Sequence, residues 1–353
     1  YKRQSEKRGE SSMNMTTKRY RRWLVGLMAL LIATTLISLQ TGQLAIGPQA
    51  IGQLLIGQGQ AQDALILVDF RMPRIIIAIL VGFALAIAGE VLQSTTQNPL
   101  ADTGFLGINS GAGIAVLLFI TFAADQGSQI FILPVLALIG ALVSAVVIVI
   151  GAYQKSVGIT ANRLLLTGVA VSTCFSALMV LLTLKLSPDN YQFVMTWLAG
   201  SIWGSSWPFI WALLPWLLLT LPYIFSKSQT LDAFVLKPDN MRSLGVDFQK
   251  QRLYLIGAAV ILAGASVSIS GGIGFIGLIT PHIARRIIGY QHRYQLLLTG
   301  LLGSCFLLVA DTCGKLLSPT AEIPAGIIVA LIGAPYFIYL LIKTKWEEYD
   351  RND

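Results

Sequence analysis

Three glycines in the stretch SGGIGFIGLITPHIARR, residues 270–286, have the spacing of a nucleotide-binding motif. Gly272, Gly274 and Gly277 form G-x-G-x-x-G, which in dinucleotide-binding proteins leads from a strand into a helix whose N-terminus faces the pyrophosphate. That chemistry also requires an acidic residue about 20 positions further on. Here that position is Leu297, and the residues before the motif form an apolar run. The dinucleotide interpretation therefore fails, and we expect glycines that allow close packing and mark a break between two membrane helices.

Few other residues could carry out catalysis or bind a metal. The two histidines, His282 and His292, are ten positions apart and have no further ligands beside them, so we expect packing or hydrogen bonding for His282 rather than a metal site. The cysteines show no metal-binding spacing. No phosphate-binding G-x-x-x-x-G-K-[ST] motif occurs. The sequence thus indicates a chain that is not an enzyme, with no catalytic residue, metal or cofactor of its own.

The composition is that of a membrane protein. Of the 353 residues, 55% are hydrophobic and 12% are charged, with a mean hydropathy of +0.70, whereas soluble domains carry roughly 25% charged residues. Long apolar runs recur from Trp23 to Ile342, which predicts an all-α, polytopic membrane protein. The net charge of +8 does not indicate a nucleic-acid partner, because the basic residues are spread over short connectors.

Hydropathy predicts about ten transmembrane helices. An even number of spans places both termini on the same side. We expect a disordered N-terminal tail at 1–22, followed by an anchor helix without a signal-peptidase site. A transmembrane domain then covers 23–343, and a C-terminal tail covers 344–353. The predicted spans are 23–41, 70–97, 107–124, 129–153, 161–186, 207–225, 252–270, 274–289, 294–310 and 322–343.

Basic residues indicate the orientation. They gather before the first span, in three connectors and after the last span, for example at Arg22, Lys155, Arg286 and Lys345. If the spans alternate, all of these positions lie on one side, which the positive-inside rule assigns to the cytoplasm. We therefore expect a multi-pass protein of the bacterial cytoplasmic membrane with both termini in the cytoplasm.

Three cations fall on the predicted outer side and break this rule. Arg71 and Arg74 open the second span in FRMPRI, and Lys315 follows the ninth. They could anchor the chain among lipid headgroups, or they could form a docking surface for an acidic external partner. Asp311 and Glu322 flank Lys315 in the sequence and could pair with it, with each other or with neither.

One inner connector, at 226–252, is long and mixed in charge. Pro238 and Gly245 occupy positions typical of a helix start and of the residue after a helix end. Met241 and Leu244 would share one face of that short helix. The connector could therefore insert into a groove on a soluble partner, or it could be an ordinary amphipathic connector.

The second span contains two further candidates. Its end at Asn98-Pro99 is a polar turn, which could gate a pathway or simply reverse the chain. Glu90 lies deep in the span, and Gln93 follows one turn later. Ionisable groups inside a membrane indicate function by default, so these two residues could line a translocation pathway or bond to a neighbouring helix.

Several of these stretches resemble one known family. FRMPRI, GFALAIAGEVLQSTTQNPLADTGFLGINSGAG, RLLLTGVA, GGIGFIGLITPHIARR and LLVADTCGKLLSPTAEIPAGIIVALIGAPYFIYLL are similar to the FecCD-type permeases of iron–siderophore and cobalamin ABC importers, in order from about residue 70 to residue 342. The resemblance implies the type II importer fold, with ten helices per subunit. It also implies a second permease, identical or paralogous, two cytoplasmic ATPase subunits that use ATP and Mg, and an external substrate-binding protein.

The resemblance also implies a cargo, which would be a ferric siderophore, with cobalamin or haem as the alternative. A different class of membrane protein, an ion-coupled secondary transporter, would work without ATPase subunits.

The resemblance further implies roles for individual residues. The family's docking arginines fall on Arg71 and Arg74, and Lys315 stands where relatives often have arginine. The ATPase-coupling loop falls on 236–247, with Leu236, Pro238, Met241, Arg242, Leu244 and Gly245. The cytoplasmic gate falls on Asn98, Pro99 and Leu100, with Thr160 and Asn162 as a second layer.

Overall fold

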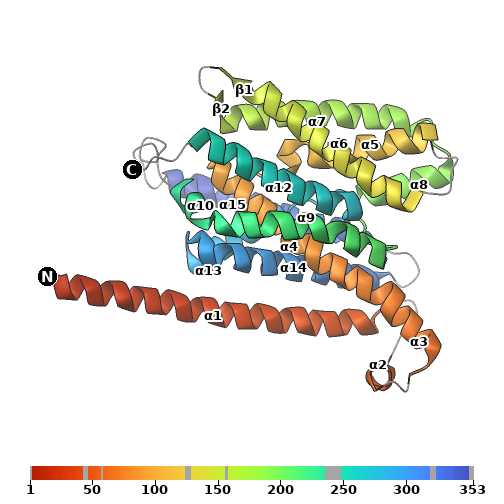
Figure 1. Ribbon diagram of the computed structural model, residues 1–353, viewed down its shortest axis with the longest axis horizontal. Helices are drawn as coiled ribbons and strands as arrows, with labels where there is room; N and C mark the ends of the chain where they lie inside the picture. Colours follow the sequence, from red (N-terminus) through yellow and green to blue (C-terminus); the bar gives the residue numbers. More distant parts are fainter. Residues whose placement is uncertain are drawn as a thin grey trace.

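The computed structural model describes residues 2–42, 47–56, 59–123, 129–155, 158–234, 248–318 and 323–349. Over these ranges the chain is a bundle of long helices that run side by side (Figure 1). The long helices are α1 (Lys2–Gln40), α4 (Met72–Thr96), α5 (Ile108–Ala123), α6 (Gln129–Ala152), α7 (Ala161–Thr183), α9 (Trp207–Ser226), α12 (Phe248–Ser270), α13 (Ile276–Ile288), α14 (His292–Leu317) and α15 (Ala325–Tyr349).

Each predicted span coincides with one of these helices. Within the described ranges, seven helices are long and apolar enough to cross a membrane, and Ile108–Phe122 and Ala325–Leu340 are shorter apolar helices. Helix α13 has 13 residues. The predicted break in the glycine-rich stretch lies between the end of α12 at Ser270 and the start of α13 at Ile276. The all-α, polytopic membrane fold is confirmed.

The N-terminal segment differs from the expectation. Helix α1 is continuous from Lys2, so residues 2–22 are helical where we expected disorder. Their polar composition suggested disorder, but Lys, Arg, Glu, Gln and Met are good helix formers and no proline interrupts the stretch. A helix that has already formed in an apolar segment extends readily into such residues. Helix α15 likewise continues to Tyr349, past the expected end of the last span.

Shorter elements connect the long helices. They are α2 (Pro48–Leu55), α3 (Ala61–Leu65), η1 (Ile66–Arg71), the 3-10 turn η2 (Thr103–Leu106), β1 (Tyr153–Gln154), β2 (Gly158–Ile159), α8 (Pro188–Leu198) and α10 (Ser228–Phe234). Helix α3 and the π-helical turn η1 run directly into α4 and give one apolar helix over Ala61–Thr96. Strands β1 and β2 pair antiparallel. In Figure 1, α10 and the strand pair lie at the left end of the bundle, while α2, α3 and α8 lie at the right end.

Helix α4 occupies the centre of the bundle. It packs against α12, α13 and α14, and 78% of its most apolar stretch is buried. Two glycine pairs bring the backbones together: Gly82 meets Gly303 of α14, and Gly89 meets Gly277 of α13. Gly277 is the third glycine of the G-x-G-x-x-G stretch, so its role in this fold is close helix packing.

Helix α7, unlike the central helix α4, is mostly exposed. Only 11% of its most apolar stretch is buried, and it exposes large apolar side chains such as Leu166, Val169 and Val180. An apolar helix with so little cover from its own chain must face lipid or another subunit.

Candidate functional site

A carboxylate on α14 holds two of the predicted docking cations. Arg74 places Nε and Nη2 at 2.9 and 2.8 Å from Asp311 Oδ1. Lys315, one turn further along α14, places Nζ at 2.8 Å from Asp311 Oδ2 and at 3.1 Å from Ser38 Oγ of α1. Of the alternatives for Asp311, pairing with Lys315 is therefore the one found. Glu322 lies outside the described residues.

The third cation also has a partner within the chain. Arg71 ends η1 and donates a hydrogen bond to the carbonyl oxygen of Leu39 in the last turn of α1, where unpaired carbonyls favour a positive charge. Arg71 is 7% exposed, and the side chains of Arg74 and Lys315 are 11% and 7% exposed. In this conformation the three cations are turned inward instead of being presented to solvent.

The predicted gate forms a tight turn after α4. Asn98 Oδ1 accepts a hydrogen bond from the N–H of Leu100 at 2.9 Å, across Pro99, which makes an Asx turn. The second predicted layer lies at the start of α7, with Thr160 at the cap position and an exposed Asn162 in the first turn. The end of α4 and the start of α7 lie at the same end of the bundle (Figure 1).

A cavity of about 530 Å³ opens between η2, α5, α7, α13 and α15. Asp102, Asn109, Ser172 and Ser176 supply polar groups to its wall. Asn109 Oδ1 and Ser172 Oγ are buried without a hydrogen-bond partner among the described residues, which is uncommon for polar atoms in a folded protein. Burial raises the pKa of Asp102, although hydrogen bonds from Thr103 and from the backbone of Phe275 oppose that shift. A volume of this size is within the range of ligand sites.

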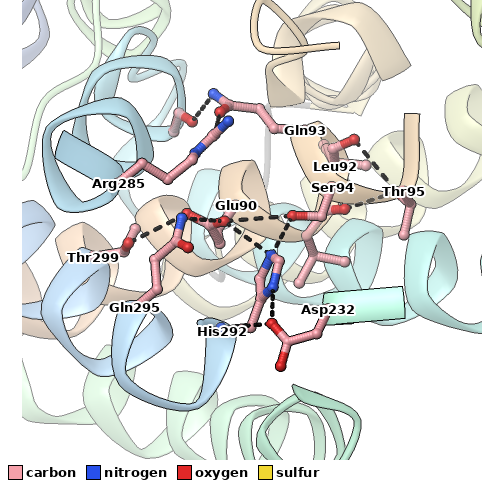
Figure 2. Close-up of polar contacts among 12 residues, drawn as sticks. Glu90, Leu92, Gln93, Ser94, Thr95, Asp232, Arg285, His292, Gln295 and Thr299 are labelled. Atoms are coloured by element: carbon pink, nitrogen blue, oxygen red, sulfur yellow. Dashed lines mark hydrogen bonds and ion pairs between the residues drawn. The ribbon is translucent and has the colours of Figure 1, made fainter. Parts of the chain in front are cut away.

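Glu90 is fully buried between α4 and α14 and makes several polar contacts (Figure 2). Its Oε1 accepts a hydrogen bond from Gln295 Nε2 at 2.7 Å, and its Oε2 accepts one from Thr299 Oγ1 at 3.3 Å. His292 Nε2 lies 3.4 Å from Oε1. Glu90 thus bonds to a neighbouring helix, and it is not among the residues that line the cavity between α5 and α7; its role in a translocation pathway stays a prediction.

Gln93 joins α4 to α13. Its Nε2 donates to the carbonyl oxygens of Gly277 and Leu278, both at 3.1 Å, and its Oε1 accepts a hydrogen bond from Arg285. Arg285 thereby brings a positive charge near Glu90. An enclosed carboxylate requires charged or hydrogen-bonding partners of this kind, and Gln93 holds α4 against α13 here; its place in a translocation pathway stays a prediction.

His292 completes this cluster, and sequence reasoning assigned it no role. Its Nδ1 lies 2.7 Å from Asp232 Oδ1 of α10, and its Nε2 lies 2.7 Å from Ser94 Oγ. These partners are 60 and 198 positions away in the chain, so spacing could not reveal them. The available signal was an ionisable residue at the edge of an apolar run. His282, by contrast, packs edge-on against Tyr336, as the expectation of a packing residue required.

The predicted coupling residues lie in 235–247, outside the described residues. They are Leu236, Pro238, Met241, Arg242, Leu244 and Gly245. Their assignment to an ATPase contact stays a prediction. The structure describes the element that leads into them, α10, which ends at Phe234.

Known proteins resemble this chain over nearly its whole length. The model of the FecCD transport family matches residues 30–343. The iron-uptake system permease protein FeuC of Bacillus subtilis is 41% identical over 90% of this chain and 96% of its own length. The iron(3+)-hydroxamate import system permease protein FhuG of the same organism is 42% identical over 90% and 95%. The vitamin B12 import system permease protein BtuC of Klebsiella pneumoniae is 35% identical over 94% and 97%.

A solved structure has the same fold. An inward-facing metal-chelate type ABC transporter superposes with a TM-score of 0.80 at 30% sequence identity. The match covers 92% of this chain and 99% of that one.

Proposed function

Because this chain belongs to the FecCD transport family, we propose that it is one permease subunit of an ATP-driven importer that carries a ferric siderophore across the cytoplasmic membrane. The observation that carries the choice of cargo is the near full-length similarity to permeases named for iron uptake and iron(3+)-hydroxamate import, at 41% and 42% identity. Cobalamin is the second candidate, since a permease named for vitamin B12 import is 35% identical. The experiment that tests this proposal is ATP-dependent uptake of ferric siderophore, with cobalamin as competitor, by the assembled importer.

The proposed assembly assigns a partner to each surface. A second permease, identical or paralogous, covers the exposed apolar side of α7. Two ATPase subunits, which hold ATP and Mg, bind at the end of the bundle where α10 lies, and this end faces the cytoplasm together with both termini. An external substrate-binding protein docks at the opposite end, near α3 and the start of α4 (Figure 1).

The cavity beside α7 supplies this subunit's part of the pathway. Its wall combines apolar side chains, such as Val169 and Leu278, with a few polar ones, a composition typical of small-molecule sites. ATP draws the ATPase subunits together, and the paired permeases then exchange inward-open and outward-open states. The turn at Asn98 closes the cytoplasmic end in the outward-open state.

Asp311 competes with an acidic binding protein for Arg74 and Lys315, which makes the docking proposal testable. Asp311→Asn removes the internal carboxylate, so docking is expected to tighten by about threefold to tenfold. Lys315→Gln removes one cation and is expected to weaken docking by a similar factor. The measurement is the affinity of the purified binding protein for the permease complex in nanodiscs.

Lys155→Gln is the matched control for this test. Lys155 is an exposed cation near β1, at the other end of the bundle, so its removal should leave the affinity unchanged. If neither Asp311→Asn nor Lys315→Gln alters the affinity in well-folded complexes, the docking role of these cations is wrong.

A further inference from the structure

Helix α10 is attached to the start of α14 by a carboxylate. Asp232 Oδ1 accepts a hydrogen bond from the backbone N–H of His292 at 2.8 Å and a second from its ring Nδ1 at 2.7 Å. Because His292 is the first residue of α14, Asp232 satisfies one of the helix's unpaired N–H groups and places a negative charge at the positive end of its dipole. Asp232 of α10 thus caps the N-terminus of α14.

The ring of His292 carries this attachment on to α4 (Figure 2). A carboxylate only accepts hydrogen bonds, so Nδ1–H donates to Asp232 at 2.7 Å, while Nε2 lies 2.7 Å from the Ser94 hydroxyl. The same Nε2 lies 3.4 Å from Glu90 Oε1. Ser94 and Glu90 are one helical turn apart, so a single imidazole contacts two successive turns of α4.

A second contact joins α10 to the end of α4. Gln97 Nε2 donates to the carbonyl oxygen of Phe234 at 2.5 Å, and Phe234 is the last residue of α10 and is fully buried. Gln97 caps α4 with a left-handed backbone, at φ 53°. It immediately precedes Asn98 of the predicted gate turn. Helix α10 is therefore attached both to the last turns of α4 and to the residue from which the gate turn begins.

Buried ionisable groups are a costly way to hold helices together. Glu90 has no exposed surface and His292 is 2% exposed, and apolar side chains would bury the same contact area at a lower cost in desolvation. Polar networks are geometrically specific, however, because each donor requires its acceptor in one place. The network therefore fixes the position of α10 relative to α4 more strictly than apolar contacts would.

We propose that the chain of contacts Asp232–His292–Ser94/Glu90 is a positioning link, through which movement of the segment that follows α10 reaches the end of α4 and its turn at Asn98. This inference rests on the proposed function, because it assumes that an ATPase moves that segment. Asp232, His292, Ser94 and Glu90 are positioning residues that do not touch the cargo.

The test is the amount of cargo transported per ATP hydrolysed, measured with the complete importer in proteoliposomes and normalised to assembled complex. Asp232→Ala removes both hydrogen bonds to His292, so the ratio is expected to fall about tenfold. Asp232→Asn keeps an acceptor oxygen in place, so its ratio should stay within about twofold of wild type. Asp232→Ala combined with His292→Ala should be no worse than either change alone, because both break the same link.

Two further variants keep the outcome decisive. Ser94→Ala removes only one hydroxyl and is expected to lower the ratio of cargo transported to ATP hydrolysed about fivefold. This variant therefore tests the link even if the Asp232→Ala complex does not assemble. Asp189→Ala, which removes an exposed carboxylate of α8, should leave the ratio unchanged.

A wild-type ratio in assembled Asp232→Ala or Ser94→Ala complexes would overturn the link, as would fully additive losses in the double variant. A purely structural role would lower the yield of folded complex without altering the ratio. Failure of the proposed function has a different signature, since the wild-type complex itself would then show no ATP-driven uptake.

Discussion

Gly89→Ala is expected to destabilise the permease by about 3 kcal/mol or more and to lower its thermal unfolding midpoint by at least about 5 °C. A Cβ at position 89 would lie 2.1 Å from the carbonyl oxygen of Gly277 and 2.3 Å from its Cα. Both neighbouring atoms belong to backbone, which cannot rotate away as a side chain can. Helices α4 and α13 would have to separate, with loss of packing at the centre of the bundle.

The glycine-rich stretch provides the matched controls. Nothing lies within 4 Å of a Cβ built on Gly274, so Gly274→Ala should leave the midpoint within a few degrees of wild type. Gly277→Ala should be intermediate, since its Cβ would lie 2.8 Å from Asp102 Oδ1 and 2.9 Å from the carbonyl oxygen of Leu85. The measurement is thermal unfolding of purified protein in detergent. Equal midpoints for Gly89→Ala and Gly274→Ala would contradict the packing role.

Ser176→Trp is expected to reduce cargo uptake by more than about tenfold while leaving the amount of folded protein unchanged. Ser176 lines the cavity beside α7, which has a volume of about 530 Å³, and an indole projecting from this position would obstruct part of it. Ser176→Ala removes the hydroxyl without adding volume, so it should retain most of the uptake. The measurement is the initial rate of cargo uptake by proteoliposomes that contain the complete importer.

Leu218→Trp controls for the addition of a large side chain to a membrane helix. Leu218 belongs to α9, from which no residue lines the cavity, and it is 70% exposed. Uptake by this variant should match wild type. If Ser176→Trp transported cargo as fast as Leu218→Trp, the cavity would not be part of the pathway.

The membrane helices could be predicted from the sequence because their signals are local. Apolar runs of about 20 residues mark spans wherever they occur, and Pro99 and the glycines of 270–277 mark a turn and a break without reference to the rest of the chain. Helix α8 was missed because it is short, at 11 residues, and carries polar residues such as Asp189. Its proline at the first turn was the available signal.

The polar contacts could not be predicted because tertiary packing decides them. Arg74 and Asp311 are 237 positions apart, and only the packing of α4 on α14 places the carboxylate beside the guanidinium. The sequence therefore indicated that Arg74 and Lys315 lie on the outer side, but it did not indicate that both cations turn inward to pair with Asp311. Glu90 posed the same difficulty: a carboxylate in a span suggested either a pathway or a helix contact, and its contact with Gln295 of α14 appears only when the two helices are packed together.

The measurement that most directly tests the central claim is uptake by sealed proteoliposomes in which the two faces of the importer receive different partners. We predict that ferric siderophore enters only when its binding protein is present on the face near α3 and ATP is present with the ATPase subunits on the face near α10. Uptake that proceeds without the ATPase subunits, driven by a proton or sodium gradient, would contradict the account. A requirement for ATP and the binding protein on the same face would contradict it as well.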